Sequence, residues 1–296
     1  LFTHDPGMYP RRLLLAEARR LGVKLLPIDV NVSTQEFLVE PEGIRMALSD
    51  IQGMSEAEVA RVIENRPYND LADFYLRAKP SRRTLERLAT VGALDSLVDG
   101  TEYNRGDILA RVRELNAITK RPVADPNQPM LDFDLLERLP TGNKAPTKAE
   151  IVAAEMAILK MDVTEHALEQ YRPMLEEMGV VHSNELVGLR NKSEVLVAGI
   201  RVATQTPPMR SGKRVVFISL DDGTGCSDAT FFEEAQARCS AVLFNTRLVL
   251  IAGKTRRTGV RGVSIEASNA WDLKDLYKEW QKRKQTELAA PEEQQQ

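Results

Sequence analysis

The residue types that usually carry enzyme chemistry are scattered along this chain. Its three histidines, His4, His166 and His182, stand far apart and near no serine or cysteine nucleophile motif. The sequence has no GxxxxGK[ST] loop that would cradle nucleotide phosphates. The carboxylate pair Asp221-Asp222 lies in DDGTG between two alternating runs, which predicts a hairpin turn and not a metal site. We therefore predict no catalytic residue and no metal ligand in this chain.

A short turn at residues 51–55, with one glycine, is suited to phosphate binding. Ser55 is an N-cap signal and Glu58 completes a capping box, which predicts a helix from Glu56 to about Asn65. The amides of a tight turn and the partial positive charge of a helix N-terminus hold phosphate oxygens without reading bases. An ordinary helical hairpin is the alternative, since the usual motif has a second glycine where Ser55 stands. We predict duplex-DNA contacts at Gln52, Gly53, Met54 and Ser55.

A second hairpin follows the first. The sequence predicts a helix from Ile44 to the break at Gly53, a third helix over 70–77 and a fourth from Ser81 to Gly92. Around the second turn, one acid, Glu86, accompanies five basic residues: Arg77, Lys79, Arg82, Arg83 and Arg87. Such a run is often a solvated face. We nevertheless expect Arg82 and Arg83 to contact duplex DNA, because the cluster to which they belong is the most basic patch of this half.

Residues 118–147 are rich in proline and poor in apolar residues, which predicts a flexible linker. One apolar island interrupts the linker. Its pattern of a glutamine, two residues, a leucine and then an aromatic residue matches peptides that enter the apolar pocket of a sliding clamp. The alternative is an island that tacks the linker to a neighbouring surface. We predict clamp-binding residues at Gln128, Met130, Leu131 and Phe133.

From residue 194 the hydrophobic period becomes alternating. Three strands, a helix over 233–239 and two further strands predict the five-stranded barrel of an OB-fold, followed by Trp271 and a charged tail. The loops of this fold that most often bind single strands are both cationic here. Phe217 alternates with core residues and should face outward, where a base could stack, although such a residue more often packs under a helix. The predicted single-strand contacts are Arg210, Lys213, Phe217, Lys254, Arg256, Arg257 and Arg261.

Composition bounds the class of protein. The chain has 296 residues, a net charge of −3 and a pI near 5.8, so any nucleic-acid surface must be local. Two cysteines exclude a disulfide framework, and no run reaches the ~18 apolar residues of a membrane span. We expect a cytoplasmic protein that contacts no membrane. Because the chain starts at Leu1 and not at a methionine, we also expect a fragment of a longer protein.

Five stretches, in this order, resemble the C-terminal part of the alpha subunit of bacterial DNA polymerase III, a C-family DNA polymerase. They are EARRLGVKLLPIDVNVS, IQGMSEAEVARVI, LERLATVGALDSL, EMAILKMDVTEHALEQYRP and RVVFISLDDGTGCSDATFF, and they cover most of residues 1–275. The third and fourth are more similar to the error-prone, damage-tolerant subtype. The chain departs from the family at Lys160-Met161, where members commonly carry Leu-Gly.

The resemblance implies an α+β multidomain chain with tandem helix-hairpin-helix motifs followed by an OB-fold. It implies that this chain is a DNA-holding and clamp-binding portion of a DNA-directed polymerase. In that family the catalytic carboxylates lie in a palm domain that this sequence lacks, so the chain should be inactive alone. Mg is expected as a cofactor of the full enzyme only. Expected partners are double- and single-stranded DNA, a sliding clamp and further polymerase accessory proteins; a non-catalytic scaffold that binds proteins is the alternative. The predicted regions are 1–43 (end of the fingers), 44–117 (hairpins), 118–147 (linker), 148–190 (helical connector), 191–275 (OB-fold) and 276–296 (disordered tail).

Overall fold

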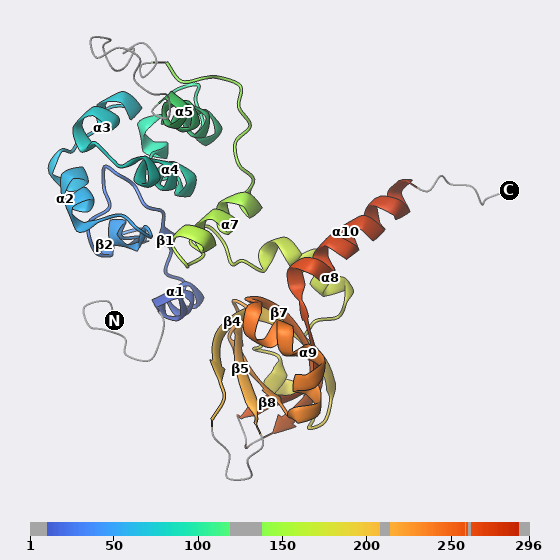
Figure 1. Ribbon diagram of the computed structural model, residues 1–296. Coiled ribbons are helices and arrows are strands. Elements are labelled where there is room, and N and C mark those ends of the chain that lie inside the picture. The colour runs from blue at the N-terminus through green and yellow to red at the C-terminus, as the bar shows by residue number, and fades with distance from the viewer. Residues whose placement is uncertain (1–10, 119–137, 208–213, 258, 260–261, 290–296) are drawn as a thin grey trace. The chain divides into compact units, whose positions relative to one another are not determined.

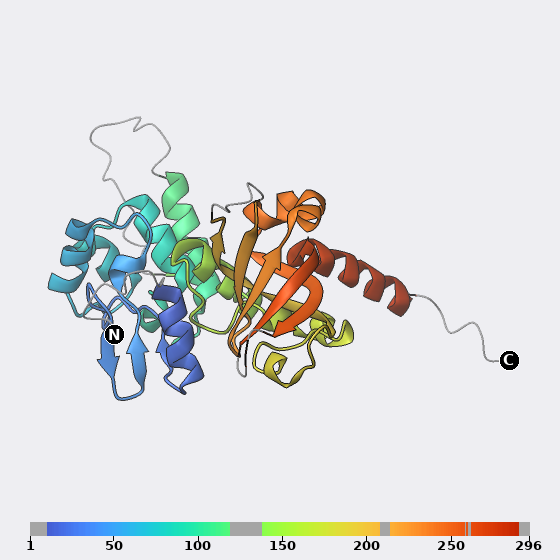
Figure 2. The same ribbon diagram turned by 90° about the horizontal axis from the view of Figure 1, so that it is seen from below.

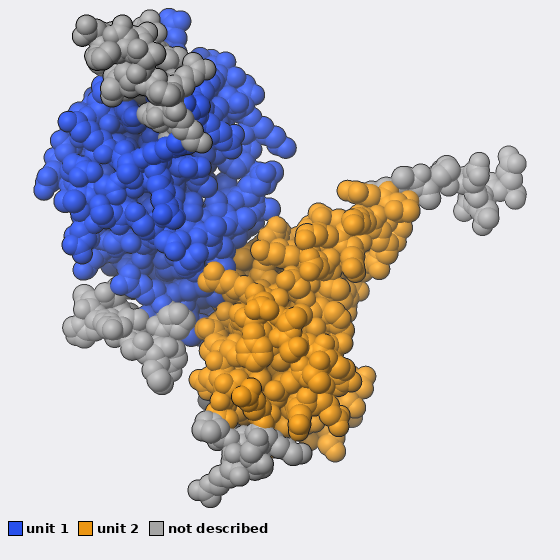
Figure 3. Space-filling view, in the orientation of Figure 1, with its two compact units in different colours: residues 1–165 blue, residues 166–296 orange. Residues whose placement is uncertain are grey.

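The computed structural model describes residues 11–118, 138–207, 214–257, 259 and 262–289 (Figure 1). The chain divides into two compact units, residues 1–165 and 166–296, which Figure 3 colours separately. Each unit has its own apolar core in the described residues.

The first unit begins with helix α1 (Arg11–Arg20) and a small sheet. Its strands are β1 (Leu25–Leu26), β2 (Leu38–Glu40) and β3 (Gly43–Arg45), in the order β1-β3-β2. Ile44 pairs with Leu25 on one side and with Val39 on the other. The sheet thus carries the chain directly into the first hairpin turn.

The helices of this unit start where sequence chemistry places them. They are α2 (Glu56–Glu64), α3 (Leu71–Ala78), α4 (Arg82–Val91), α5 (Arg105–Ile118) and α7 (Lys148–Ile158). Ser55, Asp70, Ser81 and Thr147 each cap a helix by accepting a hydrogen bond from an amide three residues on. The apolar faces of these helices meet in one core that extends from Leu15 to Val163.

The predicted helix from Ile44 to Gly53 is wrong. Only a single 3-10 turn, η1 (Leu48–Asp50), precedes Gly53, because residues 43–45 are held in the sheet and Ala47 is extended at φ −84° and ψ 144°. Met46, Leu48 and Ile51 are fully buried. The spacing of these three apolar residues resembles that of one face of a helix, because a strand followed by a tight turn buries residues at similar intervals.

Two glycines with positive φ limit the neighbouring helices. Helix α5 begins at Arg105, after Gly100 has turned the chain at φ +77°. Residues 167–178 form a 3-10 turn, η3 (Glu169–Tyr171), and a short helix, α8 (Arg172–Glu177). Gly179, at φ +68°, then ends α8.

The second unit contains the predicted barrel. Its strands are β4 (Glu194–Gln205), β5 (Val216–Asp221), β6 (Cys226–Phe231), β7 (Leu248–Arg257) and β8 (Val263–Asp272), closed in the order β4-β5-β6-β8-β7. A 3-10 turn, η4 (Leu186–Gly188), precedes the barrel, and helix α9 (Glu233–Asn245) lies between β6 and β7 in sequence. Figure 2 shows the strands of the barrel, coloured from yellow to red-orange. This topology is that of an OB-fold, as predicted.

Helix α9 is fixed to the barrel at its C-terminal end. The Arg201 guanidinium of β4 donates to the carbonyl oxygens of Leu243 and Phe244. These carbonyls belong to the last turn of the helix, where they carry partial negative charge. A cation from the first strand of the barrel therefore caps the helix.

The predicted disordered tail from residue 276 is wrong for its first part, because helix α10 spans Leu273–Ala289. Tyr277 of α10 packs edge-on against Tyr171 with ring centroids 4.9 Å apart, and stacks on Trp280. The Trp280 indole N–H and the Arg283 guanidinium both donate to the Glu177 carboxylate, at 2.9 and 2.6 Å. The charged composition suggested disorder, but these aromatic contacts fix the helix. Residues 290–296 lie outside the described residues.

No helix in the described part of the chain is long and apolar enough to cross a lipid bilayer.

The tight packing at Gly253 in β7 allows a direct test of the barrel. A methyl group there would meet the Glu266 carbonyl oxygen and lie 2.7 Å from the Ile265 Cγ2 atom. We expect Gly253→Ala to lower the free energy of unfolding of this unit by about 1–3 kcal/mol. Gly188→Ala is the matched control, because its methyl group would have no neighbour within 4 Å. Calorimetric melting of the full chain measures both, and equal melting temperatures would contradict the packing described.

Candidate nucleic-acid interface

Two turns of the first unit have the same backbone construction. Gly53 adopts φ +79° two residues before Ser55, the N-cap of α2. Lys79 adopts φ +45° two residues before Ser81, the N-cap of α4. A left-handed residue therefore sends the chain into a helix N-terminus at both places. The two consecutive hairpin turns predicted from the sequence are therefore both present.

The Glu58 carboxylate joins the two turns. Its Oε2 atom accepts from the Ser55 amide and from the Ser55 hydroxyl, both at 3.1 Å. Its Oε1 atom accepts from the Ser81 amide at 2.9 Å, across 23 residues of sequence. The sequence pattern reveals the capping box with Ser55 but not the bond to Ser81.

This carboxylate has a strongly perturbed acidity. Burial by itself raises the pKa of Glu58, but hydrogen bonds from the Ser55 and Ser81 amides and from the Thr84 and Ser81 side chains outweigh it and lower the pKa to about 2. The folded protein thus holds the proton more weakly than the unfolded chain. The stability that Glu58 contributes is complete above its ordinary pKa of 4.5 and is lost as the pH falls toward 2.

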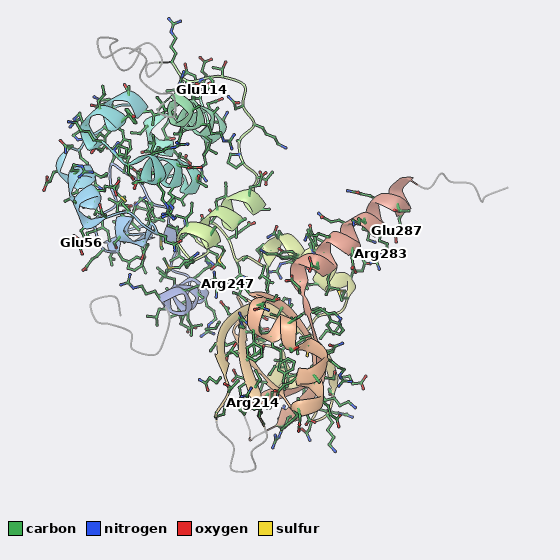
Figure 4. The ribbon with its side chains drawn as sticks, in the orientation of Figure 1. Glu56, Glu114, Arg214, Arg247, Arg283 and Glu287 are labelled. Atoms are coloured by element: carbon green, nitrogen blue, oxygen red, sulfur yellow. The ribbon has the colours of Figure 1, made fainter. Side chains whose placement is uncertain are left out.

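The two turns differ in charge. Glu56 is exposed in the first helical turn after Ser55, on α2 (Figure 4). The exposed charged residues of the second turn and of the first helical turn of α4 are cations instead: Lys79, Arg82 and Arg83. The exposed side chains therefore attract anions at the second turn, whereas the Glu56 carboxylate repels them at the first.

The predicted phosphate contacts at Gln52, Gly53, Met54 and Ser55 remain a prediction, and the structure shows how these residues are engaged. The Gln52 amide donates to the Ile158 carbonyl, the Met54 amide to Ile51, and the Ser55 amide to Glu58. The Arg87 guanidinium lies so close to Gly53 that a methyl group there would be 2.6 Å from Nη1. Three of the four amides are thus used inside the protein.

Arg77, one of the five basic residues around the second turn, serves a structural purpose. Its guanidinium donates to the carbonyl oxygens of Asn65 and Pro67, pairs with Asp73 at 2.9 Å and lies 5.2 Å from the Tyr68 ring centroid. It therefore fixes the chain between α2 and α3. A basic side chain near a turn can fill either role, and sequence alone does not separate them.

On the barrel, Phe217 of β5 faces outward as predicted. It is 38% exposed, whereas its neighbours Val216 and Ile218 are buried. On the same surface it lies between Gln205 of β4 and Thr230 of β6. A polar sheet surface with one exposed ring is a suitable platform for a stacked base.

Three cations predicted in the loop between the last two strands lie instead in β7, and their environments differ. Arg256 is exposed. Lys254 pairs with Glu194 at 3.5 Å and lies opposite Glu266 in the sheet. Arg257 donates to the Val187 and Leu189 carbonyl oxygens and thereby holds the segment before β4. Of these three residues, Arg256 is best placed to meet a nucleic-acid backbone.

The remaining predicted contacts lie outside the described residues. They are the single-strand residues Arg210, Lys213 and Arg261 and the clamp-binding residues Gln128, Met130, Leu131 and Phe133.

A groove on the barrel was not predicted from sequence. It has a volume of about 730 Å³ and follows β4, β7 and β8 beside the start of α9. Its charged lining includes Glu194, Glu234, Glu266, Arg238 and Lys254. The carboxylates outnumber the cations, so this groove does not complement a nucleic-acid strand. Closure of the barrel brings these residues together, and no local pattern marks them.

The Asp221-Asp222 pair forms the predicted turn. The Asp222 carboxylate accepts from the amides of Thr224, Gly225 and Ser183 at 2.7–3.1 Å. His182 Nδ1 lies 3.9 Å from the same carboxylate. Among the residues that the structure describes, no group of three or more His, Cys, Asp or Glu side chains could hold a metal ion.

Comparison with known proteins first identifies a motif in the first unit. Residues 22–106 match the family model described as a helix-hairpin-helix motif, which includes both turns. Solved structures similar to this chain include the mitochondrial single-stranded DNA binding protein Rim1 of S. cerevisiae, at 16% identity and a TM-score of 0.22, over 28% of this chain and 94% of that protein. Yeast Stn1 and Ten1 have a TM-score of 0.24 at 16% identity, over 34% of this chain and 57% of theirs.

Whole-sequence relatives then define the family. Error-prone DNA polymerase of Symbiobacterium thermophilum is 30% identical over 80% of this chain and 26% of its own length. Error-prone DNA polymerase of Corynebacterium diphtheriae is 30% identical over 88% of this chain and 24% of its own length. DNA polymerase III subunit alpha of Chlamydia pneumoniae is 26% identical over 89% of this chain and 22% of its own length. The chain belongs to this bacterial DNA polymerase family and spans about a quarter of the length of these relatives.

Proposed function

We propose that this chain is a DNA-holding portion of a bacterial DNA polymerase used in replication or error-prone repair synthesis. The observation that carries the proposal is the second hairpin turn, where an exposed helix N-terminus coincides with Lys79, Arg82 and Arg83. Membership of the polymerase family supports DNA as the anion. The turn would hold the phosphate backbone of duplex DNA without reading its sequence.

The barrel is proposed to hold single-stranded template. Phe217 provides a ring for stacking and Arg256 a charge for the backbone. Arg210, Lys213 and Arg261 would extend the cationic path, since they belong to the two loops that OB-folds commonly use. Arg257 contributes by fixing the neighbouring segment through its bonds to residues 187 and 189.

A sliding clamp is the proposed protein partner, bound through Gln128, Met130, Leu131 and Phe133. Its support is the sequence pattern of the linker peptide. Nucleotidyl transfer is proposed for the whole polymerase, with Mg ions stabilising the charge of the transferred phosphate, and other accessory proteins are proposed as further partners of that whole protein.

Charge reversal at the second turn tests the duplex assignment. We expect Arg82→Glu with Arg83→Glu to weaken duplex binding about tenfold or more and to reduce the dependence of log K on log salt by about 2. Fluorescence-anisotropy titrations of a labelled duplex at several salt concentrations measure both. The control is Arg113→Glu with Lys148→Glu, which makes the same charge change at two exposed residues of α5 and α7. Equal losses in the two pairs would reject the turn as the site.

Truncation of the exposed ring tests the barrel. We expect Phe217→Ala to weaken binding of a single-stranded oligonucleotide by about 1–3 kcal/mol, the usual contribution of one stacked base, and to leave duplex binding unchanged. Phe244→Ala is the matched control, because Phe244 is an exposed phenylalanine of α9 in the same unit. Identical single-strand affinities for the two variants would remove Phe217 from the site.

The linker peptide has its own test. We expect Leu131→Ala with Phe133→Ala to abolish capture of the chain by an immobilised bacterial sliding clamp, since these side chains would fill its apolar pocket. Pro126→Ala with Pro129→Ala is a control in the same linker that keeps the predicted contact residues. Undiminished capture of the first variant would reject the peptide as a clamp ligand.

A further inference from the structure

Glu58 occupies an unusual place for a carboxylate, because it stabilises two helix N-termini at once. It is 8% exposed and belongs to α2, yet one of its oxygens accepts from the N-cap amide of α4. The other oxygen closes the capping box of its own helix through Ser55. A capping box alone needs only the second set of bonds. The bond to Ser81 therefore has a purpose beyond the start of α2.

The bond to Ser81 acts on the part of the second turn that would meet DNA. Ser81 lies between Lys79, whose left-handed backbone makes the turn, and Arg82, the first residue of α4. The Ser81 hydroxyl then caps the Thr84 amide, so one short segment is held from both sides. Thr84 is itself buried at 1% exposure. The direction of the first turn of α4, and with it of Arg82 and Arg83, depends on this attachment.

A carboxylate suits this task better than its neutral analogue. Both oxygens of an ionised carboxylate accept, and bonds from amides to a charged acceptor are stronger than those to a neutral one. A glutamine has one accepting oxygen, so it satisfies one turn and presents an N–H₂ group to the other. Glutamate is thus the side chain that can hold both turns.

We propose that Glu58 is a positioning residue for DNA binding: it fixes the N-terminal turn of α4 against that of α2, so that Arg82 and Arg83 engage the phosphate backbone together. The inference rests on the proposed function of the second turn. Glu58 itself touches no DNA, because its carboxylate is buried and occupied by the two turns. It acts through the backbone that carries the two arginines.

The deciding experiment is a mutant cycle in the full 296-residue chain. Its variants are Glu58→Gln, Glu58→Asp, Arg82→Gln with Arg83→Gln, and each Glu58 change combined with the two arginine changes. The aspartate keeps the charge but is one methylene shorter, so it can cap Ser55 and falls short of Ser81. Glu64→Gln, at an exposed residue of the same helix, is the matched control. Each variant is titrated with a labelled duplex at several salt concentrations and melted by circular dichroism.

We expect Glu58→Gln and Glu58→Asp to weaken duplex binding about fivefold and to reduce the salt slope by about 1, as if one phosphate contact were lost. In the background that lacks both arginines, the same changes should have no further effect on affinity. Glu64→Gln should bind as the unchanged chain does. If Glu58→Gln unfolds the first unit, the aspartate variant decides the outcome, because it retains the capping box.

Three results would overturn the proposal, and they are distinguishable. Unchanged binding after loss of both arginines would remove the proposed function of the turn and the positioning role with it. Normal affinity and salt slope in folded Glu58 variants, with a loss in the arginine variant, would reject the positioning role alone. Equal losses from the Glu58 changes in both backgrounds would assign Glu58 to stability and not to positioning.

Discussion

The hydrogen bonds around the Glu58 carboxylate join the two hairpin turns of the first unit. Buried carboxylates are costly unless their oxygens are satisfied, and here the donors are the first amides and hydroxyls of two helices. The same bonds that make this charge tolerable also set the two hairpin turns side by side. The carboxylate that joins the two turns is also the group proposed to position Arg82 and Arg83, and the hydrogen bonds from both turns lower its pKa.

Neighbouring structural elements of this chain carry charges of opposite sign. The chain is acidic overall, and its first hairpin turn carries an exposed glutamate where the second carries arginines. The barrel repeats this contrast, because carboxylates outnumber cations in its groove while Arg256 lies exposed near the end of β7. Such separation allows an acidic protein to bind DNA at selected places and to repel it elsewhere. A negative net charge therefore does not exclude local binding of DNA.

Several arginines in the described part of the chain donate hydrogen bonds to backbone carbonyl oxygens, and two of them, Arg77 and Arg257, do so although they are exposed. Arg77 fixes the segment between α2 and α3, Arg201 caps the end of α9, and Arg257 holds the segment before β4. A guanidinium has five donors in a fixed plane, so it can satisfy several loop carbonyls that have no partner in a helix or sheet. The basic residues available for DNA are accordingly fewer than the sequence suggests.

The sequence by itself determined the local chemistry of this protein. Ser55 and Ser81 cap helices, the Asp221-Asp222 pair makes a turn, and Phe217 faces outward, because each depends on neighbours within a few residues. The order of strands likewise predicted the barrel. Tertiary structure decided that residues 44–50 form a strand and a 3-10 turn, since Leu25, one of the two sheet partners of Ile44, lies much earlier in the chain. It also decided which arginines are used internally and gave Glu58 its second partner, because a bond across 23 residues exists only after the two hairpins have packed.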